Sequence, residues 1–95
     1  MVFVSPANSI IMKKILRFTA SWCQPCKGLE MNLNSAKIVM PIEVIDIDEN
    51  EDFAMKWQVR SVPTLLMLDG ETEVKRITGI LSTKQLEEWA NIYYA

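Results

Sequence analysis

Two cysteines, Cys23 and Cys26, are the residues of this chain whose type and spacing could carry out redox chemistry. They are the only 2 cysteines among 95 residues, and one helical turn separates them, so on a helix their sulfur atoms come within bonding distance. Such a pair can alternate between a dithiol and a disulfide and exchange electrons with another disulfide. The spacing therefore predicts a site of thiol–disulfide exchange.

The pair lies where a predicted strand passes into a predicted helix. Residues 13–20 form a short apolar run, which is typical of a buried strand. Cys26, Leu29 and Leu33 then recur at helical spacing and predict a helix over residues 23–36. A junction of this kind places both cysteines at the beginning of the helix.

The start of a helix favours the reactive form of a cysteine. Unpaired backbone N–H groups and the positive end of the helix dipole stabilise a thiolate there, so the pKa of the thiol falls. We therefore expect Cys23 to be the exposed cysteine that attacks a substrate disulfide. Cys26, facing inward on the first turn, is expected to resolve the mixed disulfide, while Pro25 stiffens the turn between them.

Three other interpretations of the cysteine pair stay open at this point. The pair could form a structural disulfide, although so small a loop removes little entropy from the unfolded chain. It could contribute to a zinc site, but such a site needs about four ligands, and the chain has no histidine and no second cysteine pair. The two cysteines could also be unreactive residues of the core, but a tryptophan and a proline beside them at the end of a strand do not fit the pattern of a core segment.

The rest of the chain alternates predicted strands and helices. Residues 41–48 alternate apolar and acidic side chains and predict a strand, and Asn50 then marks the N-cap of a short helix. Residues 64–68 and 73–78 flank an Asp-Gly turn signal and predict an antiparallel hairpin.

The last predicted helix has the clearest local signature, because Ser82 and Gln85 are spaced as a capping box. Together these elements predict an α/β fold in three layers, with a central mixed sheet of four strands between helices. Residues 2–4 either add a fifth strand at the edge of the sheet or belong to a poorly ordered extension over residues 1–12.

A second feature precedes the predicted hairpin. Pro63 lies immediately before an apolar strand, 37 residues after Cys26. Proline at the start of a strand is common, whereas a cis Val62–Pro63 bond would belong to the roughly 5–6% of X–Pro bonds that are cis. Such a bond would offer the backbone of Val62 to an extended peptide beside the sulfur atoms.

Most of the chain, from Lys13 to its C-terminus, resembles the thioredoxin family. The resemblance rests on four stretches that match in order: FTASWCQPCK, VIDIDEN, VRSVPTLLMLDGE and ITGILSTKQLEEW. It implies a thioredoxin fold and reversible dithiol–disulfide exchange. It also implies an apolar substrate surface around Cys23, formed by Trp22, Pro25, Val62, Pro63, Thr78, Gly79 and Ile80.

The chain departs from the family pattern at several positions. Thioredoxins usually bury an aspartate six residues before the first cysteine, where this chain has Arg17, and the lysine that accompanies the aspartate is replaced by Val44. Gln24 follows the first cysteine in place of glycine, and Met31 replaces the proline that kinks the helix. The first strand and helix of the family are also curtailed, as in glutaredoxins.

Arg17 leads to a hypothesis about the redox chemistry. A guanidinium near the cysteines would stabilise a thiolate and hence the reduced form, which makes the couple a stronger oxidant. We therefore expect a reduction potential less negative than that of a typical thioredoxin, tuned by Arg17 together with Gln24 and Lys27. The alternative is that the Arg17 side chain extends to an edge and contacts nothing.

Composition and charge exclude several other classes of protein. A length of 95 residues favours a single domain over residues 1–95, and no apolar run approaches the roughly 20 residues that span a bilayer. With 10 basic and 12 acidic residues, nothing indicates binding to nucleic acid or to an anionic membrane. The N-terminus lacks the basic lead of a cleaved signal, which favours a cytoplasmic protein. We also expect a monomer without a metal.

Three functions are therefore considered. The leading one is a dithiol reductant of protein disulfides, with no bound cofactor beyond a reversible Cys23–Cys26 disulfide, that takes electrons from NADPH through a flavin-dependent thioredoxin reductase. The second is a glutaredoxin-like enzyme that takes electrons from glutathione. The third is a non-catalytic accessory subunit that binds a larger enzyme through a surface formed by Trp22, Pro63 and Gly79.

Overall fold

The computed structural model describes residues 13–91, so the predicted strand at residues 2–4 lies outside the described part. Each predicted element between these limits is present, with its ends shifted by one or two residues. The elements are, in order, β1 (Lys13–Thr19), α2 (Gln24–Ser35), β2 (Ile42–Asp46), α3 (Glu51–Lys56), β3 (Thr64–Asp69), β4 (Thr72–Thr78) and α4 (Thr83–Asn91).

The four strands form one mixed sheet in the order β2-β1-β3-β4. Strand β1 pairs with β2 in parallel and with β3 antiparallel, and β4 completes the hairpin with β3. Strands β1 and β3 therefore lie in the middle of the sheet, which explains why both carry runs of buried residues. The Asp-Gly turn of the hairpin uses Gly70 at a positive φ of 66°, which glycine adopts without strain.

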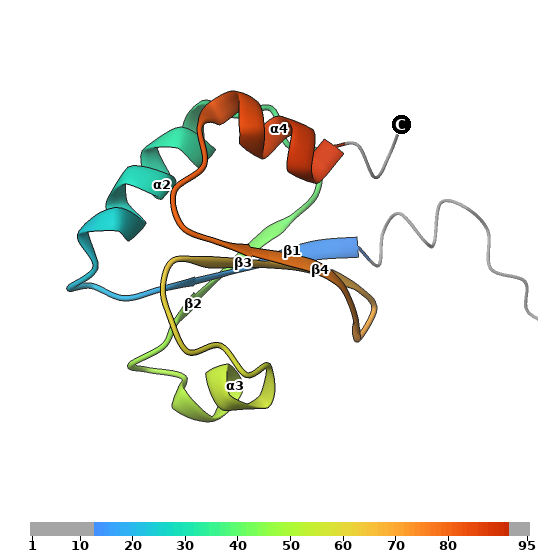
Figure 1. Cartoon of the computed structure of the whole chain (residues 1–95). Helices are drawn as coiled ribbons and strands as arrows, with labels where there is room; N and C mark the ends of the chain where they lie inside the picture. Colours follow the sequence, from blue (N-terminus) through green and yellow to red (C-terminus); the bar gives the residue numbers. More distant parts are fainter. Residues whose placement is uncertain (1–12, 92–95) are drawn as a thin grey trace, which may run out of the picture.

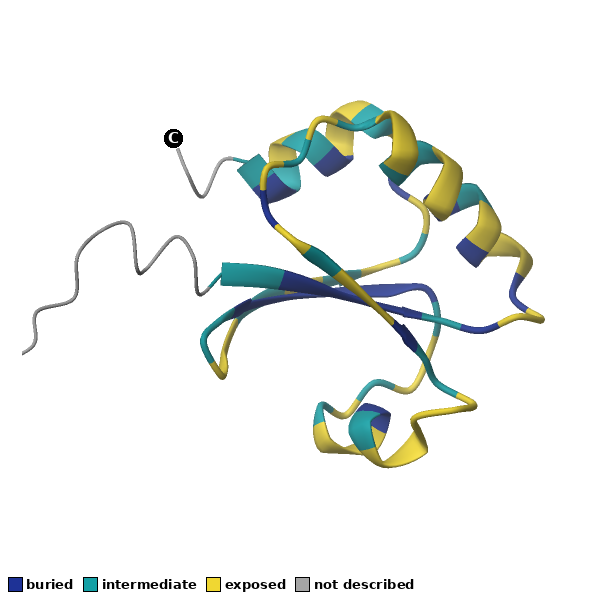
Figure 2. Cartoon of the chain, turned by 180° about the vertical axis from the view of Figure 1, so that it is seen from behind, coloured by how far each residue is buried: buried dark blue, intermediate teal, exposed yellow. Residues whose placement is uncertain are grey.

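The helices lie on both faces of the sheet, as the sequence predicts. Helices α2 and α4 cover one face and α3 covers the other (Figure 1). Buried residues fill the middle of the sheet (Figure 2), and the side chains of β1 and β3 alternate between these two layers. One core cluster lies under α2 and α4 and is built around Ile15, Leu29, Leu65, Met67, Leu81, Leu86 and Ala90. The other lies under α3 and is built around Leu16, Phe18, Ile45, Ala54, Leu66 and Leu68.

The predicted capping box is present at the start of α4. The backbone N–H of Gln85 donates to Ser82 Oγ over 3.1 Å, and the backbone N–H of Ser82 donates to Gln85 Oε1 over 2.9 Å. Two N–H groups that the helix itself leaves unpaired are thereby satisfied. The box fixes where the chain turns from the sheet into α4.

Asn50 occupies the predicted N-cap position of α3, but its side chain makes no capping hydrogen bond. Its amide nitrogen instead donates to the carbonyl oxygen of Asp46 over 3.0 Å. The side chain therefore closes the turn after β2, and the expectation that it caps the helix is wrong. Within residues 13–91, no helix is long and apolar enough to cross a membrane.

Candidate redox-active site

Cys23 and Cys26 form a disulfide at the N-terminus of α2, with their Cα atoms 5.3 Å apart. Cys23 is the N-cap residue and has an extended backbone, with φ −93° and ψ 105°. Its sulfur accepts a hydrogen bond from the backbone N–H of Cys26 over 3.1 Å. Pro25 lies in the first turn, where its missing N–H costs no helical hydrogen bond.

Both cysteines are buried in this disulfide form. Cys23 is 3% exposed and Cys26 is 2% exposed, so the prediction of an exposed Cys23 is wrong for the oxidised chain. The reason is packing on the sulfur atoms: the two cysteines form a small cluster with Ala20, and Ile47 and Val62 pack against it. In the disulfide form, Ile47 and Val62 therefore help to shield the sulfur atoms from solvent.

The loop before β3 brings the predicted substrate residues to the disulfide. The Val62–Pro63 peptide bond is cis, and the Val62 side chain packs on the cysteine cluster. The backbone N–H of Gly79 donates to the carbonyl oxygen of Pro63 over 3.0 Å, and Thr78 is the register partner of Thr64. The end of β4 therefore lies beside the Val62–Pro63 loop.

Gly79 allows the chain to leave β4 toward α4, because it has a positive φ of 99°. Ile80 follows Gly79 and its side chain reaches α2. A Cβ atom added at Gly28 of α2 would lie 3.4 Å from the Ile80 Cδ1 atom. The Ile80 side chain is nevertheless 54% exposed, so it offers apolar area at the margin of the site.

Trp22 is the most exposed aromatic residue next to the disulfide, at 66%. Its indole Nε1–H donates to Asp48 Oδ2 over 2.8 Å, which ties the loop before α2 to the loop after β2. The indole ring is thus held in place while much of its surface faces solvent. This arrangement agrees with the expected exposure of Trp22 beside the cysteines.

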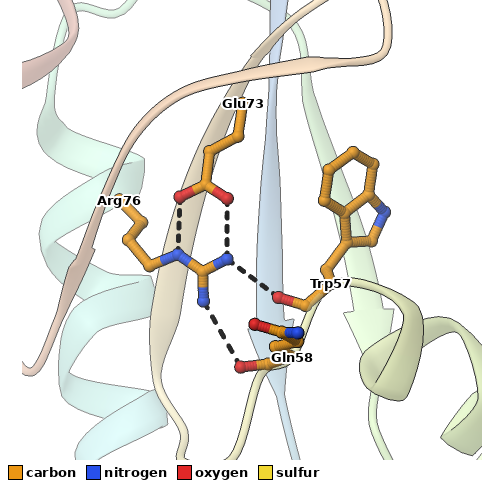
Figure 3. Close-up of polar contacts among 4 residues, drawn as sticks. All are labelled: Trp57, Gln58, Glu73 and Arg76. Atoms are coloured by element: carbon orange, nitrogen blue, oxygen red, sulfur yellow. Dashed lines mark hydrogen bonds and ion pairs between the residues drawn. The ribbon is translucent and has the colours of Figure 1, made fainter.

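Arg76 of β4 supports the chain segment that leads to the Val62–Pro63 loop (Figure 3). Its guanidinium binds both carboxylate oxygens of Glu73, over 2.7 and 2.8 Å, and also donates to the backbone carbonyls of Trp57 and Gln58, over 2.8 and 3.4 Å. The hydrogen bonds from Arg76 lower the pKa of the Glu73 carboxyl. Gln58 has a positive φ of 56°, a backbone conformation that non-glycine residues rarely adopt. The hydrogen bonds from Arg76 therefore stabilise an uncommon turn.

Arg17 contacts an acidic side chain of α2. It is 9% exposed, and its Nη2 atom lies 3.9 Å from the Oε2 atom of Glu30 in α2. The alternative expectation, in which Arg17 contacts nothing, is therefore wrong. Arg17 and Val44 are register partners in the β1–β2 pair, so the two departures from the family pattern lie side by side.

The remaining predicted tuning residues, and Pro25 of the predicted substrate surface, face solvent. Gln24, Pro25 and Lys27 are exposed on the first turn of α2, and that turn contains no acidic residue. Among residues 13–91, no group of three or more histidine, cysteine or acidic side chains is placed to hold a metal ion. The described part of the site thus consists of a disulfide, an apolar rim and a helix whose first turn contains no acidic residue.

Comparison with known proteins assigns the chain to a family. The sequence profile of thioredoxin matches residues 5–92. This chain belongs to the thioredoxin family. The thioredoxin-like fold also agrees with a solved structure of a mutant thioredoxin from Halobacterium salinarum, which superposes with a TM-score of 0.81 at 28% identity and covers 93% of this chain and 80% of that one.

Two bacterial thioredoxins illustrate the similarity in sequence. Thioredoxin C-3 of Corynebacterium nephridii is 37% identical over 73 residues, which make up 74% of this chain and 50% of that protein. The thioredoxin of Buchnera aphidicola is 33% identical over 85 residues, 83% of this chain and 76% of that protein. The chain thus spans half the length of the first relative and about three quarters of the second.

Sequence reasoning missed three residues that support the site. Glu30 pairs with Arg17, Asp48 holds Trp22, and Arg76 clamps the segment before Val62. A signal for Glu30 was present, because it lies one helical turn after Cys26 and its partner is a cation within the apolar part of a strand. Asp48 and Arg76 carry no such signal, since their partners become neighbours only through the fold.

Proposed function

We propose that this chain is a thiol–disulfide oxidoreductase that reduces disulfides in other proteins. The observation that carries the proposal is the Cys23–Cys26 disulfide at the N-terminus of α2, where Cys23 is the N-cap residue. Membership of the thioredoxin family supports the same chemistry. The reversible disulfide is the only redox group that this reaction needs, so no bound cofactor is part of the proposal.

The reaction proceeds in two exchanges of sulfur bonds. In the reduced chain, the Cys23 thiolate attacks one sulfur of a substrate disulfide, which forms a mixed disulfide and releases the other substrate sulfur as a thiolate. Cys26 then loses its proton and attacks Cys23 Sγ, which re-forms the Cys23–Cys26 disulfide and releases the second substrate sulfur. The substrate gains two electrons and, on protonation of its thiolates by solvent, two protons; the chain loses two electrons and, counted from its dithiol form, two protons to solvent.

The rim around the disulfide would receive the substrate. Val62 packs on the cysteines, and Trp22 precedes Cys23 in the chain. Ile80 lies near Gly28 of α2, and the side chains of Trp22 and Ile80 are exposed. Apolar side chains with fixed neighbours provide contact area for an extended peptide. The backbone of Val62 would pair with that peptide beside the sulfur atoms, as in the addition of a short strand.

The electrons would come from NADPH through a thioredoxin reductase. A Mycobacterium leprae protein described as a bifunctional thioredoxin reductase/thioredoxin is 35% identical over 69 residues, which make up 68% of this chain and 15% of that protein. A domain similar to this chain is therefore joined to its reductase in one polypeptide. The competing donor is glutathione.

Insulin reduction tests both the activity and the donor. The chain is assayed once with NADPH and thioredoxin reductase and once with glutathione, its reductase and NADPH. We expect turnover with the first system and little with the second. Turnover only with glutathione would make the chain glutaredoxin-like.

Two serine variants separate catalysis from a structural role. Cys23→Ser is expected to abolish turnover because it removes the attacking sulfur. Cys26→Ser keeps that sulfur but cannot resolve the mixed disulfide, so a covalent substrate adduct should accumulate and show on a non-reducing gel. If wild type and Cys23→Ser support a partner enzyme equally well, the chain is an accessory subunit and the proposal is wrong.

A further inference from the structure

We propose that the Arg17–Glu30 ion pair sets the reduction potential of the disulfide. Arg17 stabilises the cysteine thiolate of the reduced chain, and Glu30 is a positioning residue that holds the guanidinium and offsets its charge. The inference rests on the proposed function, since it concerns the same pair of sulfur atoms.

The packing of β1 places Arg17 beneath the first turns of α2. Ile15 and Leu29 belong to the core cluster on the α2 side of the sheet, and side chains two positions apart on a strand share a face. Arg17 therefore points to the same side as Ile15. Ala20, just after the strand, packs with Cys26, so along the chain Arg17 lies between Ile15, which shares a cluster with Leu29, and Ala20, which shares one with Cys26.

Glu30 occupies the corresponding place on the helix. It follows Cys26 by four residues, a spacing that makes two side chains neighbours on a helix surface. Arg17 Nη2 lies 3.9 Å from Glu30 Oε2, although only 11% of the Arg17 side chain is exposed against 54% of the Glu30 side chain. Solvent screens the exposed carboxylate more than the buried cation, so the field of Arg17 is only partly cancelled toward the interior.

The other charged residues next to the cysteine cluster are more exposed to solvent than Arg17. On α2 the first turn has no acidic residue, and Lys27 is exposed to solvent. Asp46 near Ile47 is half-buried, whereas Asp48 and, near Val62, Arg60 are exposed; the Asp48 carboxylate accepts a hydrogen bond from the Trp22 indole. Arg17 is therefore the buried charge closest to the cysteines along β1, and Glu30 is its ion-pair partner.

The sign of the effect follows from the reaction. Reduction of the protein disulfide by two glutathione molecules gives the protein dithiol and one glutathione disulfide, so two electrons move to the protein and two protons stay with the thiols. When a cysteine ionises, it gives up one of those protons. A nearby cation favours this ionised, reduced form and makes the potential less negative, whereas the carboxylate of Glu30 acts in the opposite direction.

Equilibration with glutathione at pH 7 measures the effect through the ratio of oxidised to reduced chain. Arg17→Met keeps the apolar stem and removes the charge, and we expect the ratio to rise about tenfold, which for two electrons is about 30 mV toward more negative potential. Glu30→Gln is expected to lower the ratio about threefold, because the charge of Arg17 is no longer offset. The two variants therefore shift the equilibrium in opposite directions, which a merely structural ion pair would not do.

Three further variants complete the test. Glu43→Gln removes the same charge from another half-exposed ion pair, with Lys14, and should leave the ratio unchanged. Arg17→Lys keeps the charge and should restore a ratio close to that of wild type. Arg17→Met/Glu30→Gln removes both charges, so its ratio should lie between the ratios of the two single variants.

Equal ratios for wild type, Arg17→Met and Glu30→Gln would overturn the inference while the proposed function stands. A ratio for the double variant outside the range of the two single variants would also overturn it, because the two charges would then not oppose one another. A wild-type chain that exchanges no disulfide with glutathione or with insulin would overturn the proposed function and the inference together.

Discussion

Helices α2 and α4 lie on the same face of the sheet, but they begin in different ways. In each helix the N-cap residue is joined to the residue three positions later. In α4 the joined residues are Ser82 and Gln85, linked by two hydrogen bonds. In α2 they are Cys23 and Cys26, linked by a disulfide and by one N–H to sulfur hydrogen bond.

The difference separates a stabilising helix start from a reactive one. Oxygen atoms are strong acceptors and satisfy the N–H groups of α4 permanently. Sulfur is a weak acceptor, and once the disulfide is reduced, the helix start can stabilise a Cys23 thiolate instead. The same two helical positions thus give a fixed cap in α4 and a reversible covalent link in α2.

Removing the fixed cap should affect stability alone. Ser82→Ala leaves the backbone N–H of Gln85 without its side-chain acceptor, and we expect a loss of about 1 kcal/mol in the free energy of unfolding. Urea denaturation of the oxidised chain measures this loss. The ratio of oxidised to reduced chain in glutathione should stay at the wild-type value, and a changed ratio would show that the two helix starts are not independent.

Adding a carboxylate at the start of α2 should sharpen the contrast between the two helix starts. Gln24→Glu places a carboxylate at the exposed first position of α2, where it interacts favourably with the helix dipole by about 0.5 kcal/mol. The same carboxylate disfavours the Cys23 thiolate, so insulin reduction at pH 7 should slow about threefold. Asn34→Glu adds an equal charge near the other end of α2 and serves as control. Equal slowing in both variants would contradict a local effect.

The smallest effect is expected at a contact remote from both helix starts. Arg76 lowers the pKa of Glu73, so the pair stabilises the fold while Glu73 is ionised, and this contribution disappears as the pH falls through the lowered pKa. Relative to Glu73→Gln, wild type should be more stable by about 0.5 kcal/mol above pH 5. Urea titrations from pH 7 to pH 2.5 should show this difference shrinking, and a difference that persists at pH 2.5 would contradict the assignment.

Much of the fold could be predicted from the sequence because its signals are local. The capping box at Ser82, the Asp-Gly turn and the apolar runs of β1 and β3 each depend on residues close together in the chain. The position of the cysteine pair at the start of a helix follows in the same way. The spacing of Cys23 and Cys26 thus located the site without knowledge of the tertiary structure.

The parts that escaped prediction depend on distant residues. The burial of Cys23 comes from Ile47 and Val62, which reach the disulfide from two other segments. The Trp22–Asp48 hydrogen bond joins residues 26 positions apart. Asn50 fits a cap by its type, but the carbonyl oxygen of Asp46 competes for its side chain.

Asn32 in the middle of α2 links this helix to the beginning of α4. Its side-chain amide donates to the backbone carbonyl oxygen of Leu81 over 2.8 Å, and the backbone carbonyl oxygen of Asn32 accepts from the Thr83 hydroxyl over 3.3 Å. The segment from Gly79 to Leu81 is thereby anchored from the helical layer as well as from Pro63. A docking face anchored on both sides is preorganised and loses little conformational entropy on association. Selection among partners should therefore depend on how well their shape matches a rigid template.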